Sequence, residues 1–355
     1  MNALKNRDIK YVNNNFDMFL TDIDRYWIFN SNLENLLTKD KSLKYYLLYS
    51  YLWNSFTQDE YSRDKDIIDE NILNGEIKIL IGVGGFGKVF KILNYKGETY
   101  IEKIIIADKD EYFGYKRELK ILSQIKEFCN PYLICLTSHK FFKNHKSKGF
   151  KDKDNIRHLI IRMPNIENSC TLDEISANIT LNTKLYITHQ LLLGLYQLHS
   201  LGITHNDIKS DNILVSKEGV RYIDFGISVS ETDKILSKDK HILYSKFTIK
   251  NIYSIARWNV NTIYKTDIFM LGLMLYILFF GTSLYDKELT LENINYHIQY
   301  RKYILYQNAD LICNFLQLVL IPDWNKILSI KKILEWFEKS FDTKQGKIEF
   351  QKIDF

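Results

Sequence analysis

Hydrophobic and polar positions change their spacing along the chain. Between Ile77 and Met163, short apolar runs separated by turn residues predict strands at 77–81, 88–93, 99–106, 133–142 and 157–163. One segment of this region, 112–128, has helical spacing instead. After Thr171, long amphipathic or apolar runs predict helices at 181–200, 267–280, 290–300, 309–320 and 329–341. We therefore expect an α+β protein, with a small β-rich part followed by a larger helical part.

Residues 1–75 have a pattern of their own. They contain no proline and no glycine before Gly75, and apolar residues recur at helical spacing within 16–28 and 43–52. We interpret them as a helical N-terminal extension, which is either a packing appendage or a regulatory, partner-binding module. The expected organisation is an extension at 1–75, a β-rich lobe at 76–164 and a helical lobe at 165–355.

Composition and charge limit the classes of function. With 355 residues and 46% apolar content the chain can bury a sizeable core. A net charge of +5 does not indicate a dedicated nucleic-acid binder. The N-terminus lacks the apolar core of a signal peptide, and the apolar run 268–280 is too short to span a membrane. We expect an intracellular, cytoplasmic protein without a membrane span.

Two further features concern the cysteines and a basic stretch. The four cysteines form no C-x-x-C pair and no metal-ligand spacing, which favours reduced thiols; they are Cys129, Cys135, Cys170 and Cys313. The lysine-rich stretch 140–153 predicts a solvated loop, with a docking site for an anionic partner as the alternative.

A glycine-rich run lies at 81–89, where the sequence reads Ile-Gly-Val-Gly-Gly-Phe-Gly-Lys-Val and contains the spacing G-x-G-x-x-G. In a dinucleotide-binding fold such glycines end a strand and open a helix. Here residues 88–93 read as a strand, which favours a glycine-rich hairpin folded over phosphates. Small residues let backbone amides approach the phosphate oxygens.

The strongest chemical signal lies at 203–214, which reads Ile-Thr-His-Asn-Asp-Ile-Lys-Ser-Asp-Asn-Ile-Leu, with Asp224-Phe225-Gly226 ten residues later. The first run places an Asp two residues before a Lys and five before an Asn. The second is an acidic turn that could hold a divalent metal ion. Together they supply a proton acceptor, a cation for phosphate and metal ligands, as phosphoryl transfer from a nucleotide requires.

These motifs resemble those of the protein kinase superfamily over about residues 76–340. The resemblance implies a bilobal protein-kinase-like fold and an enzyme that uses ATP and Mg²⁺. It implies that Asp207 accepts or orients the proton of the attacking hydroxyl group, and that Lys209 neutralises charge on the γ-phosphate. The implied metal ligands are Asn212 and Asp224.

The resemblance also assigns the nucleotide-binding residues. Lys103 would hold the α- and β-phosphates and pair with Glu118 on the helix at 112–128, Glu111 being the weaker candidate. Val89 would pack on the base, and Leu214 would support the adenine from below. The full set of ATP contacts is Ile81, Gly82, Val83, Gly84, Gly85, Phe86, Gly87, Lys88, Val89, Ile101, Lys103, Met163 and Leu214.

Two departures from the family pattern lie near the adenine. Ile101 stands where the family commonly has Ala, which adds bulk above the base. The hinge between the lobes is expected within 161–165, where Pro164 has no N–H to donate to adenine.

Further departures concern the segment after the metal loop. Asn206 replaces the Arg that a phosphorylated activation loop holds in many kinases, so we expect activity that does not depend on such phosphorylation. The activation loop would be 227–257, without a clear Ala-Pro-Glu motif at its end. The Arg that pairs with that motif is also missing at 321–326. Asp267 resembles the aspartate that anchors the catalytic loop.

The sequence thus predicts a protein kinase that acts on Ser or Thr hydroxyl groups of protein substrates, because Lys209 fits the pattern of Ser/Thr kinases. His205 and Phe225 are expected to be structural. Two alternatives stay open. One is a pseudokinase that binds partners without catalysis, and the other is a kinase for a small molecule or lipid.

Overall fold

A computed structural model describes residues 77–84, 87–93, 98–107, 112–143, 157–175, 179–231, 260–284, 290–305, 308–323 and 325–342. The expected helical extension at 1–75 lies outside the described residues. So do Glu111, most of the lysine-rich stretch and the greater part of the expected activation loop, 232–257.

The chain divides into two compact units. The first, here called the β-unit, holds Met1–Tyr115 and Leu136–Asn165. The second, the helical unit, holds Lys116–Cys135 and Ile166–Phe355. Helix α7 (Tyr112–Glu127) begins in the β-unit and continues in the helical unit.

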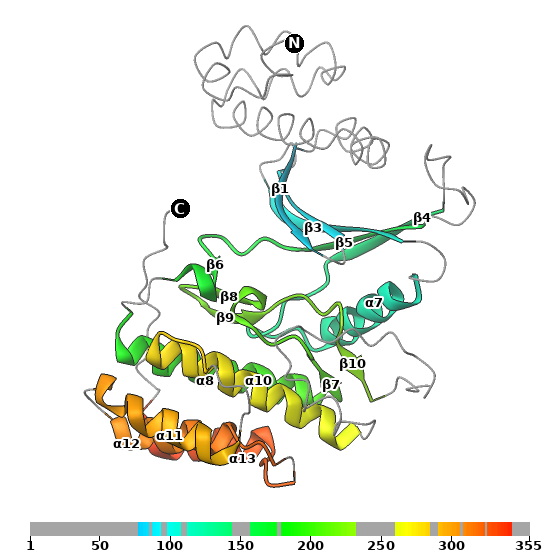
Figure 1. Ribbon diagram of the computed structural model, residues 1–355. Helices are drawn as coiled ribbons and strands as arrows, with labels where there is room; N and C mark the ends of the chain where they lie inside the picture. Colours follow the sequence, from blue (N-terminus) through cyan, green and yellow to red (C-terminus); the bar gives the residue numbers. More distant parts are fainter. Residues whose placement is uncertain are drawn as a thin grey trace, which may run out of the picture. The chain divides into compact units, whose positions relative to one another are not determined.

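The described part of the β-unit is built on one antiparallel sheet with the strand order β1-β2-β3-β5-β4 (Figure 1). The strands are β1 (Ile77–Gly84), β2 (Gly87–Leu93), β3 (Thr99–Ala107), β4 (Ser138–Lys143) and β5 (Arg157–Pro164). Because side chains alternate between the two faces of a strand, the register sorts them into two sets. The face opposite Lys103 carries a buried apolar cluster of Phe90, Ile92, Ile104 and Ile160.

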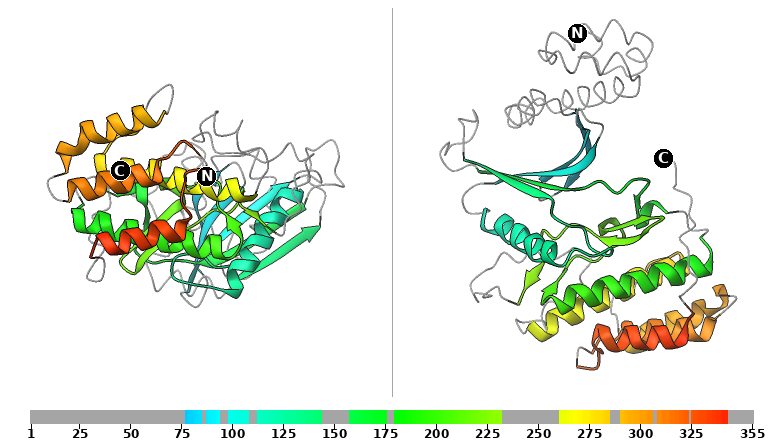
Figure 2. Two further views of the ribbon diagram at one scale, coloured as in Figure 1. Left: turned by 90° about the horizontal axis from the view of Figure 1, so that it is seen from below. Right: turned by 180° about the vertical axis from the view of Figure 1, so that it is seen from behind.

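The helical unit is organised around α8 (Leu181–Ser200), which contacts α10 (Val260–Phe280), α13 (Ile330–Ser340) and the strand β9 (Gly219–Tyr222). Helices α8 and α10 run alongside each other in both figures (Figure 1, Figure 2). Helix α10 also contacts α12 (Ala309–Val319), and α12 contacts α11 (Leu291–Arg301). Buried leucines and isoleucines of α8 make this helix the centre of the core, because it packs on several sides at once.

Short strands in the helical unit carry the loops of chemical interest. Strand β8 (Ile213–Ser216) pairs with β9 (Gly219–Tyr222) and β6 (Cys170–Thr171), and β7 (Ile203–Thr204) pairs with β10 (Val229–Ser230). The loop after α7 is bonded to the β8–β9 hairpin through the backbone of Tyr222. Its N–H donates to the carbonyl of Tyr132, and its carbonyl accepts from the N–H of Ile134.

The expected α+β class, with a β-rich N-terminal part and a helical C-terminal part, is confirmed. Helix 181–200 has the predicted bounds, while α10 begins seven residues before the predicted 267. The strand predicted at 133–142 is wrong at its start, because β4 begins at Ser138 and Leu133 forms only an isolated bridge to Tyr222. Among the described helices, none is long and apolar enough to cross a membrane.

The expectation of four reduced thiols is wrong for one pair. Cys129 and Cys135 form a disulfide, with their Cα atoms 5.9 Å apart, while Cys170 and Cys313 are free and buried. The physical reason is a tight turn after α7. Asn130 Oδ1 accepts a hydrogen bond from Tyr132 N–H (2.9 Å). This turn reverses the chain between the two cysteines, which are six positions apart, and brings them close together.

Candidate active site

The centre of the candidate site is Asp207, which lies in the loop between β7 and the short 3₁₀ turn η2 (Ser210–Asn212). Asn212 Nδ2 donates to the Asp207 carbonyl oxygen (2.9 Å) and to its carboxylate Oδ2 (2.8 Å). Lys209 Nζ lies 3.0 Å from the same Oδ2. Three of the four sequence-predicted catalytic and metal residues of this region are therefore in direct contact.

These contacts engage one oxygen of the Asp207 carboxylate and leave the other available. Asp207 Oδ1 is buried and accepts no hydrogen bond within the described structure. A buried polar atom without a partner is costly, and such atoms cluster where a ligand or reaction partner completes them. The geometry suits a carboxylate that accepts a proton from an incoming hydroxyl group.

The ring of His205 connects the catalytic loop to the residue before Asp224. Its Nε2 donates to the carbonyl oxygen of Ile223 (3.0 Å), because a carbonyl can only accept, and Nδ1 accepts from Asp207 N–H (3.3 Å). Phe225 is fully buried with its ring centroid 5.1 Å from that of His205. Both side chains therefore lie where a structural role was expected.

The two predicted metal ligands flank the β8–β9 hairpin, Asn212 before it and Asp224 after it. Ile213 pairs with Tyr222, and Ile223 N–H donates to the Asn212 carbonyl (3.0 Å), so Asn212 lies opposite the residue that precedes Asp224. Because Asn212 Nδ2 is engaged by Asp207, its amide oxygen is the group left to bind a cation. A carboxylate and an amide oxygen fit Mg²⁺, which takes few protein ligands and fills its shell with phosphate and water.

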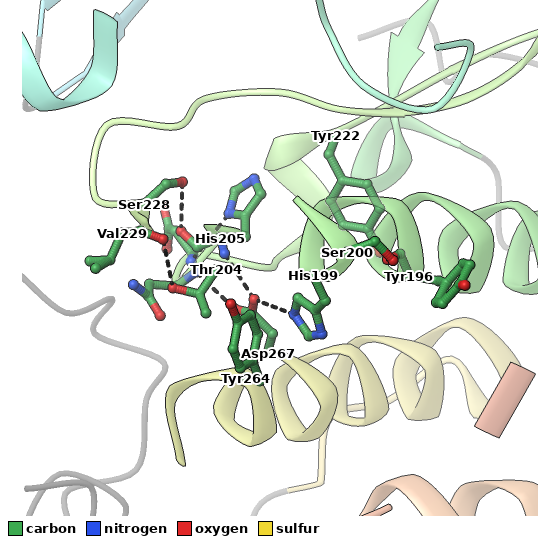
Figure 3. A network of polar contacts seen from close by, with 12 residues as sticks. Tyr196, His199, Ser200, Thr204, His205, Tyr222, Ser228, Val229, Tyr264 and Asp267 are labelled. Carbon is green, nitrogen blue, oxygen red and sulfur yellow. Dashed lines mark hydrogen bonds and ion pairs between the residues drawn. The ribbon is translucent and has the colours of Figure 1, made fainter. Parts of the chain in front are cut away.

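Asp267, near the middle of α10, anchors the catalytic loop (Figure 3). Its fully buried carboxylate accepts from the backbone N–H groups of His205 and Asn206, both at 2.8 Å, and from His199 Nε2 at 2.9 Å. Three donors offset the cost of burying this charge.

Asn206 and its neighbours connect the catalytic loop to the segment that follows Asp224. Asn206 has a positive φ of 65°, a conformation that Asn tolerates better than most residues. Its buried side chain donates to the Ile227 carbonyl oxygen (3.2 Å). Ser228 Oγ donates to the His205 carbonyl (3.0 Å), and Thr204 Oγ1 donates to the Val229 carbonyl (3.4 Å), as Figure 3 shows for the last two. The first residues after Asp224 are thus bonded directly to the catalytic loop.

Four of the predicted nucleotide contacts of the β-unit share one face of its sheet, whereas Lys88 pairs with Ile104 on the opposite face. Val89 lies opposite Lys103, Lys103 lies opposite Ile161, and Ile101 lies opposite Met163. Because register partners point to the same side, Val89, Ile101, Lys103 and Met163 are brought together. Lys103 is 6% exposed, so this ammonium group lies within the structure rather than in solvent.

The described part of the glycine-rich run lies at the end of β1 and the start of β2. Gly82 pairs with Val89, Val83 with Lys88, and Gly84 with Gly87. Gly87 has a φ of +140°, and a Cβ there would lie 2.3 Å from the Ile104 carbonyl oxygen, so only glycine fits. Gly85 and Phe86 lie outside the described residues, and only the strand backbone is described for Val83 and Gly84.

Other predicted site residues are placed as follows. Ile81 is 55% exposed at a bulge in β1, and Lys88 is half-buried on β2. Leu214 is half-buried on β8 of the helical unit. Glu118 is buried on α7, with Leu119 and Leu122 also buried beside it. Lys103 and Glu118 belong to different units, and their ion pair stays a prediction.

Comparison with known proteins decides the family. The model of the protein kinase domain family matches residues 76–336. The chain belongs to this family. The mouse (Mus musculus) protein myosin-IIIa is 33% identical over 178 residues, which is 47% of this chain and 10% of that protein. The chain therefore spans about a tenth of the length of that relative.

Two other relatives carry kinase names. Mitogen-activated protein kinase kinase 7 of Arabidopsis thaliana is 26% identical over 64% of this chain and 70% of that protein. Cyclin-dependent kinase 9 of Homo sapiens is 31% identical over 42% of this chain and 40% of that protein. Both agree with the family assignment.

Sequence reasoning missed several contacts of this kinase domain. Glu102 is fully buried and accepts from Arg162 Nε (2.9 Å), while the Arg162 guanidinium lies 4.7 Å from the centre of the Tyr100 ring. The signal was available, because Tyr100, Glu102 and Ile104 alternate onto one face of β3. His199 was also missed. It lies in the last turn of α8 and is separated from Asp267 by 68 residues, so no local pattern connects them.

Proposed function

We propose that this chain is an ATP- and Mg²⁺-dependent protein kinase that transfers the γ-phosphate of ATP to Ser or Thr hydroxyl groups of protein substrates. The observation that carries the proposal is the carboxylate of Asp207. Its Oδ2 is fixed by Asn212 and Lys209, and its buried Oδ1 accepts no hydrogen bond within the described residues. Such a group is positioned for the proton of a substrate alcohol.

In the proposed reaction the substrate hydroxyl donates a hydrogen bond to Asp207 Oδ1. Its oxygen forms the new bond to the γ-phosphorus while the bond from that phosphorus to the β-phosphate oxygen breaks. The proton passes to Asp207 and ADP leaves. Lys209 lies within 3.0 Å of the same carboxylate, so its ammonium group can neutralise charge on the transferred phosphoryl group.

Asn212 and Asp224 are the proposed ligands of Mg²⁺, which would neutralise charge on the phosphates when bound. Lys103, on the same sheet face as Val89, Ile101 and Met163, is proposed to bind the α- and β-phosphates with the adenine beside it. Glu118 is proposed as the carboxylate that fixes Lys103. Leu214, Ile81, the glycine-rich run and the backbone of Lys88 complete the proposed ATP site, since the Lys88 side chain lies on the opposite face of the sheet.

The preference for Ser and Thr rests on Lys209, which matches the Ser/Thr pattern of the family in its position two residues after Asp207. Protein substrates are the expected partners of a protein kinase domain. The extension at 1–75 is proposed as an addition to the kinase domain, since the family match begins at residue 76.

Incubation of the full chain with γ-labelled ATP, Mg²⁺ and three acceptor classes tests this function. The acceptors are mixed proteins, phospholipid vesicles and a panel of small hydroxylated metabolites. The proposal predicts label on Ser and Thr of proteins. Label on lipids or metabolites alone would contradict it, and bound ATP without any transfer would indicate a pseudokinase.

A further inference from the structure

A second network continues outward from the anchor residue Asp267 and ends at Glu231. Glu231 directly follows β10 and is the last residue described before the gap at 232–259. Its backbone N–H donates to the Gly202 carbonyl (2.8 Å), in the turn between α8 and β7. Its carboxylate Oε1 accepts from the hydroxyl group of Tyr264 on α10 (2.7 Å). One residue thus joins the segment after Asp224 to two other elements.

Tyr264 passes this connection to the catalytic loop. Its ring packs edge-on against the ring of His199, with centroids 4.7 Å apart and an interplanar angle of 64° (Figure 3). His199 Nε2 donates to Asp267, whose carboxylate holds the N–H groups of His205 and Asn206. The path from Glu231 to the loop that carries Asp207 is therefore continuous.

We propose that Glu231 and Tyr264 are positioning residues, which hold the catalytic loop and the segment after Asp224 in their working arrangement without a phosphate group. This inference rests on the proposed kinase function and adds the means by which the site is ordered. Neither residue touches the reacting atoms, so each acts through His199 and Asp267.

Asn206 and the described residues after Asp224 lack the positive charge that could hold a phosphate. Asn206 offers one neutral hydrogen bond, to Ile227, where a cationic side chain would attract a phosphate. The residue at 229, which is bonded to Thr204 through its backbone, is a valine without charge. Residues 225–231, the described start of this segment, carry no Lys or Arg. Neither they nor Asn206 therefore offer a cation to a phosphate group.

Tyr264 can donate to Glu231 over the pH range of ordinary assays. Burial, followed by the hydrogen bond to Glu231, raises the pKa of Tyr264 above its ordinary value of 10. The hydroxyl group therefore keeps its proton, and its role as donor, below that value. A hydrogen bond to a carboxylate is also stronger than one between neutral groups.

The absence of a side chain at Gly202 lets Glu231 lie close to the turn between α8 and β7. Its φ is +72°, and a Cβ there would lie 3.1 Å from Glu231 Oε2. The Glu231 side chain therefore packs directly on the turn that leads into the catalytic loop, and a side chain at 202 would displace it.

The test uses Tyr264→Phe, which removes only the hydroxyl group and keeps the ring against His199, and Glu231→Ala. Each variant should lower kcat about fivefold to tenfold while KM for ATP stays within about twofold of wild type. The double variant should fall no further, because both changes remove the same contact. Glu231→Gln keeps an oxygen acceptor and should restore most of kcat. Tyr303→Phe alters a 72% exposed tyrosine and serves as the matched control.

Amide hydrogen exchange gives a readout that does not depend on activity. The N–H groups of His205 and Asn206 should exchange at least about fivefold faster in Tyr264→Phe and Glu231→Ala than in wild type. Unchanged exchange and kcat would overturn the inference, as would losses that multiply in the double variant. If the wild-type protein transfers no phosphate, the proposed function fails, and exchange alone decides whether these residues hold the loop.

Discussion

The side-chain amide of Asn212 donates to both the backbone carbonyl and the carboxylate of Asp207, at 2.9 and 2.8 Å. The same amide group presents its oxygen as a candidate metal ligand. One side chain therefore fixes the distance between the proposed proton acceptor and the proposed Mg²⁺ site. Because phosphoryl transfer depends on position more than on a strong base, this coupling is central to the site.

Asn212→Ala should impair metal use and chemistry together. Loss of the ligand oxygen should raise the Mg²⁺ concentration for half-maximal activity severalfold, and loss of both bonds to Asp207 should lower kcat by about 10- to 100-fold. Steady-state rates over a Mg²⁺ titration measure both effects. Asp211→Ala, which alters the exposed neighbouring residue, is the control. An unchanged Mg²⁺ requirement in Asn212→Ala would contradict the proposed ligand role.

Asn206→Ala should destabilise the kinase domain by about 1–3 kcal/mol, because the buried carbonyl of Ile227 loses its donor. Alanine also disfavours the positive φ at this position by about 1 kcal/mol. Asn206→Gly removes the hydrogen bond without that conformational cost and should be about 1 kcal/mol more stable than Asn206→Ala. Urea unfolding of both variants checks the order. Equal stability of wild type and Asn206→Ala would show that this bond contributes nothing.

Activity should not require a phosphate on the segment after Asp224. The bonds from Asn206, Ser228 and Thr204 already tie its first residues to the catalytic loop. Protein treated with a phosphatase, with the phosphatase then removed, should keep its transfer rate within about twofold of the untreated sample, because these side-chain hydrogen bonds do not involve a phosphate. A large loss that returns on rephosphorylation would refute this expectation.

Two glycines of the proposed phosphate loop should respond differently to alanine. At Gly87 a Cβ would meet the Ile104 carbonyl at 2.3 Å with φ at +140°, so Gly87→Ala should cost about 2–4 kcal/mol in unfolding free energy. At Gly82 the nearest atom is 3.9 Å away, and Gly82→Ala should change stability by less than about 1 kcal/mol. Thermal unfolding of the nucleotide-free protein compares them. Equal melting temperatures would contradict the strand pairing between β2 and β3.

The cysteines can be counted chemically. Denatured, unreduced protein should take up two maleimide groups per chain, at Cys170 and Cys313, and four after reduction. Closing the short loop between Cys129 and Cys135 should stabilise the fold by about 2 kcal/mol, so reduction should lower the melting temperature. Four adducts before reduction would show that the pair is not bonded in the isolated protein.

Much of the catalytic region could be predicted because its chemistry is local in the chain. Asp207, Lys209 and Asn212 lie within six residues, so one turn brings them into contact regardless of the rest of the fold. Helix α8 was also predictable, since Thr180 accepts from Thr183 N–H at its start and the apolar pattern continues to Ser200.

The remaining features depend on contacts between distant residues. Tyr264 and Glu231 are 33 residues apart, and neither stands out in its own segment. The strands β7 and β10 have two residues each, too short to show alternation. The bond between Cys129 and Cys135 was not predicted, because their spacing alone does not show that the chain reverses direction between them.

Transfer of labelled γ-phosphate by the wild-type chain and by Asp207→Asn, compared in parallel with Mg²⁺ and an acceptor protein rich in Ser and Thr, tests the central claim most directly. The proposed role of Asp207 predicts label on Ser and Thr with wild type, and a rate about 10²- to 10⁴-fold lower with Asp207→Asn, while ATP affinity stays within about twofold. Equal rates for the two proteins, or wild type that binds ATP and labels no protein, would contradict it.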